Sequence, residues 1–180
     1  MKYEISPAAI FVVCCAAACL PAGDFTALCA AALIHESAHA VCAVALGYKI
    51  KGIRLTPSGV SMIFPDARSY RHAVMIAVCG PLANLATCFV SDGRLFTYSA
   101  LLATVNLMPL FSLDGQTVLS GISHLLLPLS AADALCHAVG AVFTAAAWII
   151  SVYILFFSGA NMAMLIFVSW LFAETMLKGG

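Results

Sequence analysis

The chain alternates long apolar stretches with short polar segments. A membrane-spanning helix needs about 20 mostly apolar residues, and six stretches approach or exceed that length, although the first and the fourth are short. They are Pro7–Leu20, Phe25–Leu46, His72–Val90, Leu95–Leu110, Ala132–Phe157 and Ala160–Met176. The pattern predicts an all-α polytopic membrane protein with about six transmembrane helices. The run after Lys2 also resembles a signal peptide, but we favour a first span that is retained.

One polar segment departs from the helical pattern. Within Tyr48–Phe64, Ile53 and Leu55 alternate with Arg54 and Thr56, and a Pro-Ser-Gly turn separates them from a second alternating run. A period of two on both sides of a turn predicts a small β-hairpin after the second span. We expect it at the membrane surface. An irregular amphipathic loop is the alternative.

Composition and charge narrow the class of protein. The 180 residues are 63% hydrophobic and 9% charged, which is too little charge to cover a soluble surface. The net charge is zero, and the scattered cations leave no basic patch for nucleic acid. Five cations lie in the loop between the second and third stretches, which the positive-inside rule places in the cytoplasm: Lys49, Lys51, Arg54, Arg68 and Arg71. We therefore expect a multi-pass protein, in a bacterial cytoplasmic membrane.

The cysteines do not indicate a metal site. There are eight, almost all within the apolar stretches and without C-x-x-C spacing. This arrangement fits neither a disulfide framework nor a cysteine zinc site, so we interpret them as small hydrophobic residues.

An H-E-x-x-H motif, His35 to His39, lies inside the second apolar stretch. Residues four apart share one face of a helix, so both imidazoles can reach one metal ion. Glu36 follows the first histidine and can take a proton from a metal-bound water. An acidic residue at mid-bilayer costs about 2.5–3.5 kcal/mol on insertion scales. The motif therefore predicts a zinc site within the bilayer rather than a chance cluster.

A catalytic zinc needs a third protein ligand. Four side chains in apolar surroundings are candidates: Asp114, His124, His137 and Glu174. We favour Asp114, because Pro109 should break the fourth helix before it and Gly115 permits a tight turn after it. Irregular backbone at membrane depth is tolerated where it is buried in protein or lines a wet cavity, so this segment is typical of a site.

These motifs together resemble the site-2 protease family of intramembrane zinc metalloproteases. H-E-x-x-H at 35–39 is followed by G-P-x-x-N at 80–84 and N-x-x-P-x-x-x-x-D-G at 106–115, in the family's order over residues 25–120. The loop from Gly47 to Gly59 is similar to the family's surface hairpin. The short N-terminus, the six spans and the lack of a PDZ-like insertion most resemble the stage IV sporulation FB type.

The resemblance implies roles for individual residues. Three would be ligands of one zinc ion per chain: His35, His39 and Asp114. Glu36 would be the catalytic acid and base. Asn106 and Pro109 would shape the substrate cleft, and Asn84 is a weaker candidate for a polar contact there, with plain interhelical hydrogen bonding as the alternative.

Some positions depart from the family's pattern. Phe111 and Ser112 stand where many members have proline, and Gln116 stands where a second glycine is frequent, which puts the shape of this loop in question. We expect a single membrane-embedded domain over residues 1–180, with neither a PDZ nor a CBS domain.

The predicted function is hydrolysis of peptide bonds in a membrane-associated protein, in the sporulation branch a transcription-factor precursor. The hairpin would hold an unwound substrate as an added strand. One alternative is a metal-binding pseudoenzyme, which the intact Glu36 argues against. An ion or proton transporter is the other, and it lacks the expected paired broken helices. The substrate, an inhibitory membrane partner and a homo-oligomer all stay open.

Overall fold

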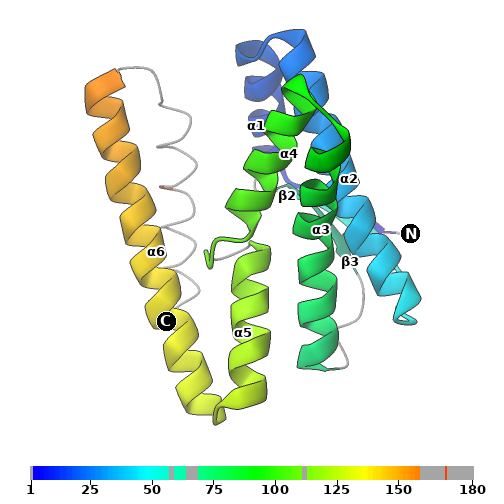
Figure 1. The fold of residues 1–180 in the computed structure, drawn as a ribbon, viewed down its shortest axis with the longest axis vertical. Helices are drawn as coiled ribbons and strands as arrows, with labels where there is room; N and C mark the ends of the chain where they lie inside the picture. The colour runs from blue at the N-terminus through cyan, green and yellow to red at the C-terminus, as the bar shows by residue number, and fades with distance from the viewer. Residues whose placement is uncertain (1, 57–58, 64–68, 111–112, 159–168, 170–180) are drawn as a thin grey trace. The chain divides into compact units, whose positions relative to one another are not determined.

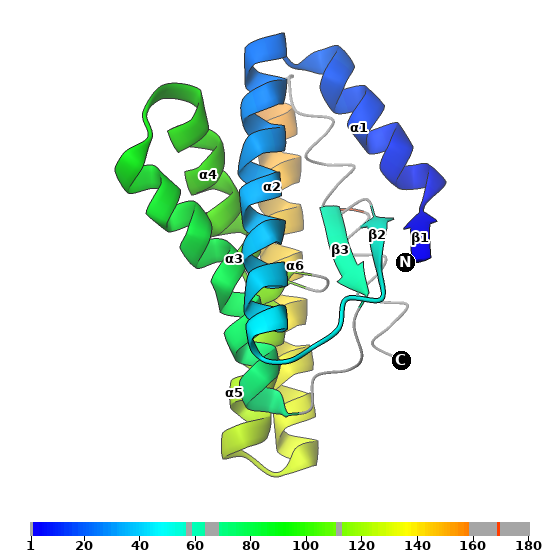
Figure 2. The ribbon, with the colours of Figure 1, turned by 90° about the vertical axis from the view of Figure 1, so that its right-hand side faces the viewer.

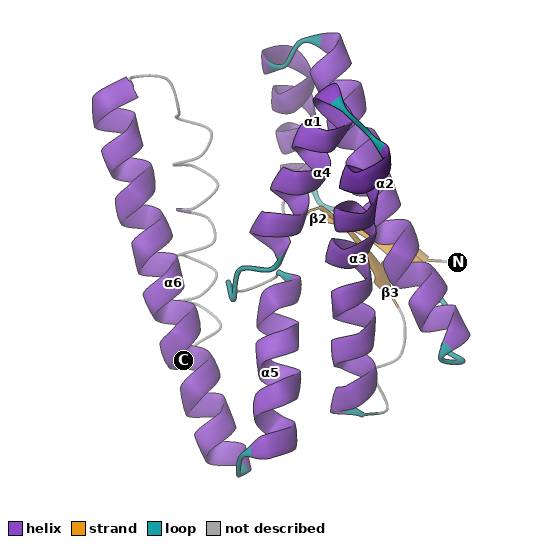
Figure 3. Cartoon of the chain, in the orientation of Figure 1, coloured by secondary structure: helices purple, strands orange, loops and turns teal. Residues whose placement is uncertain are grey.

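The computed structural model describes residues 2–56, 59–63, 69–110, 113–158 and 169. Its helices are α1 (Pro7–Cys19), α2 (Ala22–Ala45), α3 (Tyr70–Val90), α4 (Gly93–Asn106), α5 (Asp114–Leu126) and α6 (Leu129–Ser158), and its strands are β1 (Lys2–Ile5), β2 (Gly52–Thr56) and β3 (Gly59–Ile63). Figures 1 and 3 show these elements along the chain. The chain divides into two compact units, Met1–Leu107 and Met108–Gly180, and each is described by itself.

Three of the described helices are long and apolar enough to cross a membrane. They are α2, α3 and the Leu129–Ile154 part of α6. Large apolar side chains such as Leu33, Phe89 and Ile149 are exposed on them, as expected for surfaces that face lipid. The helices therefore support the predicted integral membrane protein.

The number of spans stays a prediction. Helices α1 and α4 have 13 and 14 residues, short of the roughly 20 that a perpendicular span needs. The sixth predicted stretch, Ala160–Met176, lies outside the described residues.

In the first unit, α2 packs against α3 and α4 (Figure 1). The buried residues of α2 include Ala31, His35 and Ala43, at spacings of four and eight that keep them on one face of the helix. On α3, Gly80 and Asn84 are buried at the same spacing. Small residues at such an interface let two helix backbones approach closely. The face of α2 that carries the H-E-x-x-H motif is therefore the face that packs.

A hydrogen bond joins the two ends of the loop between α2 and α3. Tyr48, just after α2, is buried with Ala43 and Ile76. Its hydroxyl lies 3.0 Å from His72 Nδ1 in the first turn of α3. This contact ties the start of the strand-bearing loop to the helix that follows it.

That loop contains two of the three strands of a small sheet. β2 and β3 pair antiparallel with Ile53 opposite Met62, in the segment where the alternation predicts strands. β1 pairs parallel with β2, so the order is β1-β2-β3. Figure 2 shows the sheet beside α2, which β3 contacts. Strand β1 is not predicted from the sequence, because its four residues before a helix carry too short a pattern. The position of the sheet at a membrane surface stays a prediction.

The second unit contains α5 and α6, which pack against each other. The apolar pattern predicts no element over Asp114–Leu126, because its polar face and 13-residue length do not give the pattern of a span. Gly115, Gly121 and Ser123 are its buried residues. The Gln116 side chain donates to the Cys136 carbonyl oxygen of α6 at 3.4 Å. Gln116, which stands where a second glycine is frequent in the family, thus joins α5 and α6.

Candidate metal centre

His35 and His39 lie one helical turn apart on α2, and their rings converge. The two Nε2 atoms are 3.1 Å apart. The ring centroids are separated by 4.7 Å, with the planes nearly perpendicular. His35 is 4% exposed, and His39 is half-buried. The H-E-x-x-H spacing thus does bring two imidazole nitrogens to one point.

Helix α3 holds the other nitrogen of each ring. His39 Nδ1 lies 2.7 Å from the Ile76 carbonyl oxygen, and His35 Nδ1 lies 3.2 Å from Asn84 Nδ2. Ile76 and Asn84 are eight residues apart, so they flank Gly80 on one face of α3. Each histidine therefore has its outer nitrogen held by α3 and its inner nitrogen directed at the other histidine.

Gly80 leaves the space in which the two rings meet. A Cβ atom built on Gly80 would lie 2.6 Å from His39 Cε1 and 2.8 Å from His35 Cε1, and closer still to His39 Nε2. Real Cβ atoms essentially never come within 3.0 Å of such atoms. In the sequence this glycine is identified only as part of G-P-x-x-N. The available signal was a glycine within an apolar helix, which often indicates close approach of a neighbouring element.

This arrangement fits a zinc ion. Zinc binds imidazole nitrogen readily, and the outer nitrogen of a zinc-bound histidine normally hydrogen-bonds a carbonyl or carboxylate oxygen. The Ile76 carbonyl oxygen already makes this contact with the outer nitrogen of His39. Beside His35, the buried Asn84 Oδ1 has no hydrogen-bond partner among the described residues. Such a site requires two converging imidazole nitrogens, a neighbouring helix position without a side chain, and an oxygen acceptor for the outer nitrogen.

Glu36 and Asp114 lie on different units. Glu36 is half-buried on α2, directly after His35. Asp114 is the half-buried first residue of α5, and the positive end of a helix dipole favours its ionised carboxylate. Because Asp114 belongs to the second unit, its role as the third ligand stays a prediction.

The predicted cleft residues lie around the end of α4. Asn106 is the last residue of α4, and its side-chain Nδ2 donates to the Leu102 carbonyl oxygen at 3.0 Å. Pro109 lies inside a tight turn in which the Leu110 N–H donates to the Met108 carbonyl oxygen at 2.8 Å. The helix ends before Pro109, as predicted. Asn84 is fully buried and bonded to His35, so its observed polar contact is the interhelical alternative. Contacts of these residues with a substrate stay predictions.

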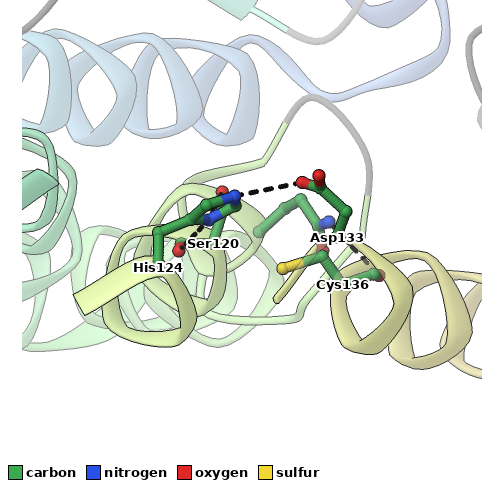
Figure 4. Close-up of polar contacts among 5 residues, drawn as sticks. Ser120, His124, Asp133 and Cys136 are labelled. Carbon is green, nitrogen blue, oxygen red and sulfur yellow. Dashed lines mark hydrogen bonds and ion pairs between the residues drawn. The ribbon is translucent and has the colours of Figure 1, made fainter. Parts of the chain in front are cut away.

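The remaining ligand candidates have other surroundings within the second unit or fall outside the described residues. His124 Nδ1 lies 2.8 Å from the Ser120 carbonyl oxygen and Nε2 lies 3.0 Å from Asp133 Oδ1, so both of its ring nitrogens have protein partners (Figure 4). His137 is exposed on α6. Glu174 lies outside the described residues.

The fold is that of a known class of membrane protein. No protein-family profile and no curated protein sequence matches the chain. Among solved structures, the chain is similar to a site-2 protease from Methanocaldococcus jannaschii, with a TM-score of 0.66 and 20% sequence identity. The match covers 97% of this chain and 89% of that one. At this identity the likeness shows the fold: nearly the whole chain has the fold of a site-2 protease.

Proposed function

We propose that the protein is an intramembrane zinc metalloprotease of the site-2 protease family. One observation carries the proposal: within an apolar helix, the His35 and His39 Nε2 atoms converge to 3.1 Å over the bare backbone of Gly80, with Glu36 beside them. A buried group of this kind is costly within a bilayer unless it binds a partner or a metal.

The residues have distinct roles in this proposal. His35, His39 and Asp114 hold one zinc ion. When bound, zinc supplies a Lewis acid that activates water and polarises a peptide carbonyl. Glu36 accepts the proton of the attacking water and returns it to the leaving amine. Asn106 and Pro109 shape the cleft for the scissile segment.

The substrate in this proposal is a membrane protein or a membrane-associated protein. A helix hides its carbonyls in backbone hydrogen bonds, so the segment to be cleaved must be held extended. Among the described strands β2 pairs on both sides, and β1 and β3 are the two edges of the sheet. β3 is the edge strand that contacts α2, the helix of the H-E-x-x-H motif, so an extended substrate would add to the β3 edge.

The orientation of the site and the kind of substrate belong to the same proposal. The positively charged loop supports an orientation with the site towards the cytoplasm of a bacterial membrane. A transcription-factor precursor in sporulation is the substrate that the sporulation-type resemblance suggests.

The test separates proteolysis from metal binding alone. The full chain is purified in nanodiscs, bound zinc is counted, and cleavage of a membrane-tethered substrate is measured for the unmodified protein and for Glu36→Gln. We expect about one zinc in both and cleavage in the unmodified protein alone. Asp133→Asn is the matched control, because it makes the same change from carboxylate to amide at an exposed ion pair. Zinc without cleavage in the unmodified protein would favour the pseudoenzyme, and the lack of any metal would refute the site.

A further inference from the structure

Two of the eight cysteines face each other across the interface of α2 and α3. Cys42 lies three residues before the end of α2 and Cys79 lies on α3, and their thiols are within hydrogen-bonding reach of each other. Both side chains are half-buried. Cys42 also packs against the cluster of Ala43, Tyr48 and Ile76, which joins the same two helices. The two thiols therefore meet as part of the helix packing.

The two helix backbones come close together beside this pair. Cys79 is directly followed by Gly80, where an added Cβ would lie 2.6 Å from His39 Cε1. Small residues at an interface allow such an approach. A disulfide needs Cα atoms about 4.4–6.8 Å apart, and close helix packing favours that separation. The pair thus lies where a covalent bond between α2 and α3 is geometrically favoured.

We propose that Cys42 and Cys79 are a redox-sensitive thiol pair, which a peroxide converts to a disulfide that weakens zinc binding at the neighbouring histidines. The sulfur of one thiol attacks the O–O bond of hydrogen peroxide, which gives a sulfenic acid and one water. The sulfur of the second thiol displaces the hydroxyl group of the sulfenic acid, and its proton leaves with that group as a second water. The two thiols are oxidised, the peroxide is reduced, and a dithiol reductant reverses the bond by exchange.

The predicted orientation towards the cytoplasm agrees with this chemistry. Disulfides in a reducing compartment are usually transient and serve in catalysis or in redox sensing. Hydrogen peroxide is small and uncharged, so it can reach half-buried thiols. The inference rests on the proposed zinc site and adds to it a means of control.

The bond would act on the histidine pair through Gly80. Two hydrogen-bonded sulfurs must come closer by about 1 Å or more to form a disulfide, and Cys79 is the residue next to Gly80. An added Cβ at Gly80 would already collide with both rings, so there is no free space to absorb the movement. Metal–ligand distances tolerate only about 0.2 Å. Oxidation should therefore displace the rings and lower the zinc affinity.

The first measurement maps the disulfide. The full chain in nanodiscs is treated with hydrogen peroxide, its free thiols are alkylated, and it is digested after lysine and arginine. Cys42 then lies in peptide 3–49 and Cys79 in peptide 72–94. We expect mass spectrometry of the monomer to show these peptides joined, and the joined species to be lost in Cys42→Ala and in Cys79→Ala. Cys88→Ala is the matched control, because Cys88 lies in the same peptide and its thiol donates to backbone carbonyl oxygens.

Zinc titrations then measure the consequence. In the unmodified protein and in Cys88→Ala, peroxide should lower the zinc affinity about tenfold or more, the usual effect of disturbing the groups that orient a ligand. Dithiothreitol should restore it. In Cys42→Ala and in Cys79→Ala the zinc affinity should match that of the reduced unmodified protein and should not respond to peroxide.

The outcomes separate this inference from the proposed function. Failure of the two peptides to join would overturn the inference, as would joined peptides with unchanged zinc affinity. If one alanine variant does not fold, the other variant and the unmodified protein still decide it. If the reduced, unmodified protein binds no zinc, the proposed function fails, and the joined peptides alone show whether the disulfide forms.

Discussion

The Gly80→Ala substitution tests whether the histidine pair requires a residue without a side chain at position 80. The new Cβ would lie 2.6 Å from His39 Cε1, about 0.8 Å inside the 3.4 Å at which ordinary van der Waals contact begins. Metal–ligand distances tolerate only about 0.2 Å. Either the two helices separate or the imidazole turns away, and both movements exceed that tolerance.

The sign of the stability change shows whether Gly80 faces a tight contact or open space. Alanine is a better helix former than glycine by about 1 kcal/mol, so Gly80→Ala would make the protein more stable if the position were open. Overpacking a tight interface costs about 1–3 kcal/mol, and here the added atom meets both rings. We therefore expect Gly80→Ala to unfold at a lower temperature and to bind zinc at least tenfold more weakly.

The assay is a zinc titration and a thermal unfolding curve on the protein in nanodiscs. Ala86→Val is the control, because Ala86 is exposed on the same helix and the change also adds volume. A Gly80→Ala protein with full zinc affinity would show that the histidines do not meet over Gly80, and the described packing of α2 on α3 would be wrong.

Three further predictions test other parts of the proposal. Asp114→Asn should weaken zinc binding by more than about 100-fold, beyond the usual loss of an outer partner, and equal affinity in a zinc titration would remove Asp114 from the site. Val60→Pro should retain zinc and reduce cleavage at least tenfold, because proline removes a backbone donor from the edge strand, whereas Ile53→Pro would also break the central strand. Normal cleavage by Val60→Pro would count against strand addition. Tyr48→Phe should lower stability by about 0.5–1.5 kcal/mol in thermal unfolding with zinc affinity unchanged, and a loss of zinc would place the loop contact within the site.

The predictable part of the site is the part that one helix encodes. His35 and His39 lie on one face because their spacing matches the helical repeat, and their convergence follows from the sequence. Their partners Ile76 and Asn84 are 37 and 49 residues away along the chain from the histidines that they contact. One of them acts through a backbone carbonyl, which any residue has. No residue-type pattern can single out that acceptor.

The fold shows the same division between local and distant information. The apolar runs predicted α2 and α3, since length and hydropathy are properties of one segment. The segment before α1 was missed as a strand, because β1 exists only by pairing with β2, some 50 residues later. Asp114–Leu126 was missed for the opposite reason: it is too short to be a span, and it pairs with α6 through contacts such as that of Gln116 with Cys136.

The histidine pair also explains why the H-E-x-x-H motif on α2 depends on several positions of the neighbouring helix α3. The Nε2 atoms of His35 and His39 face each other at 3.1 Å, so the outer Nδ1 atoms are the ones that take partners from the neighbouring helix. Helix α3 meets this requirement with a carbonyl at one turn, no side chain at the next and an amide at the third. At Gly80 any side chain would collide with the rings, whereas the Ile76 contact uses the backbone and is independent of the side chain. The glycine at 80 and the amide at 84 are therefore better explained by the two histidines that they contact than by the packing of apolar helices.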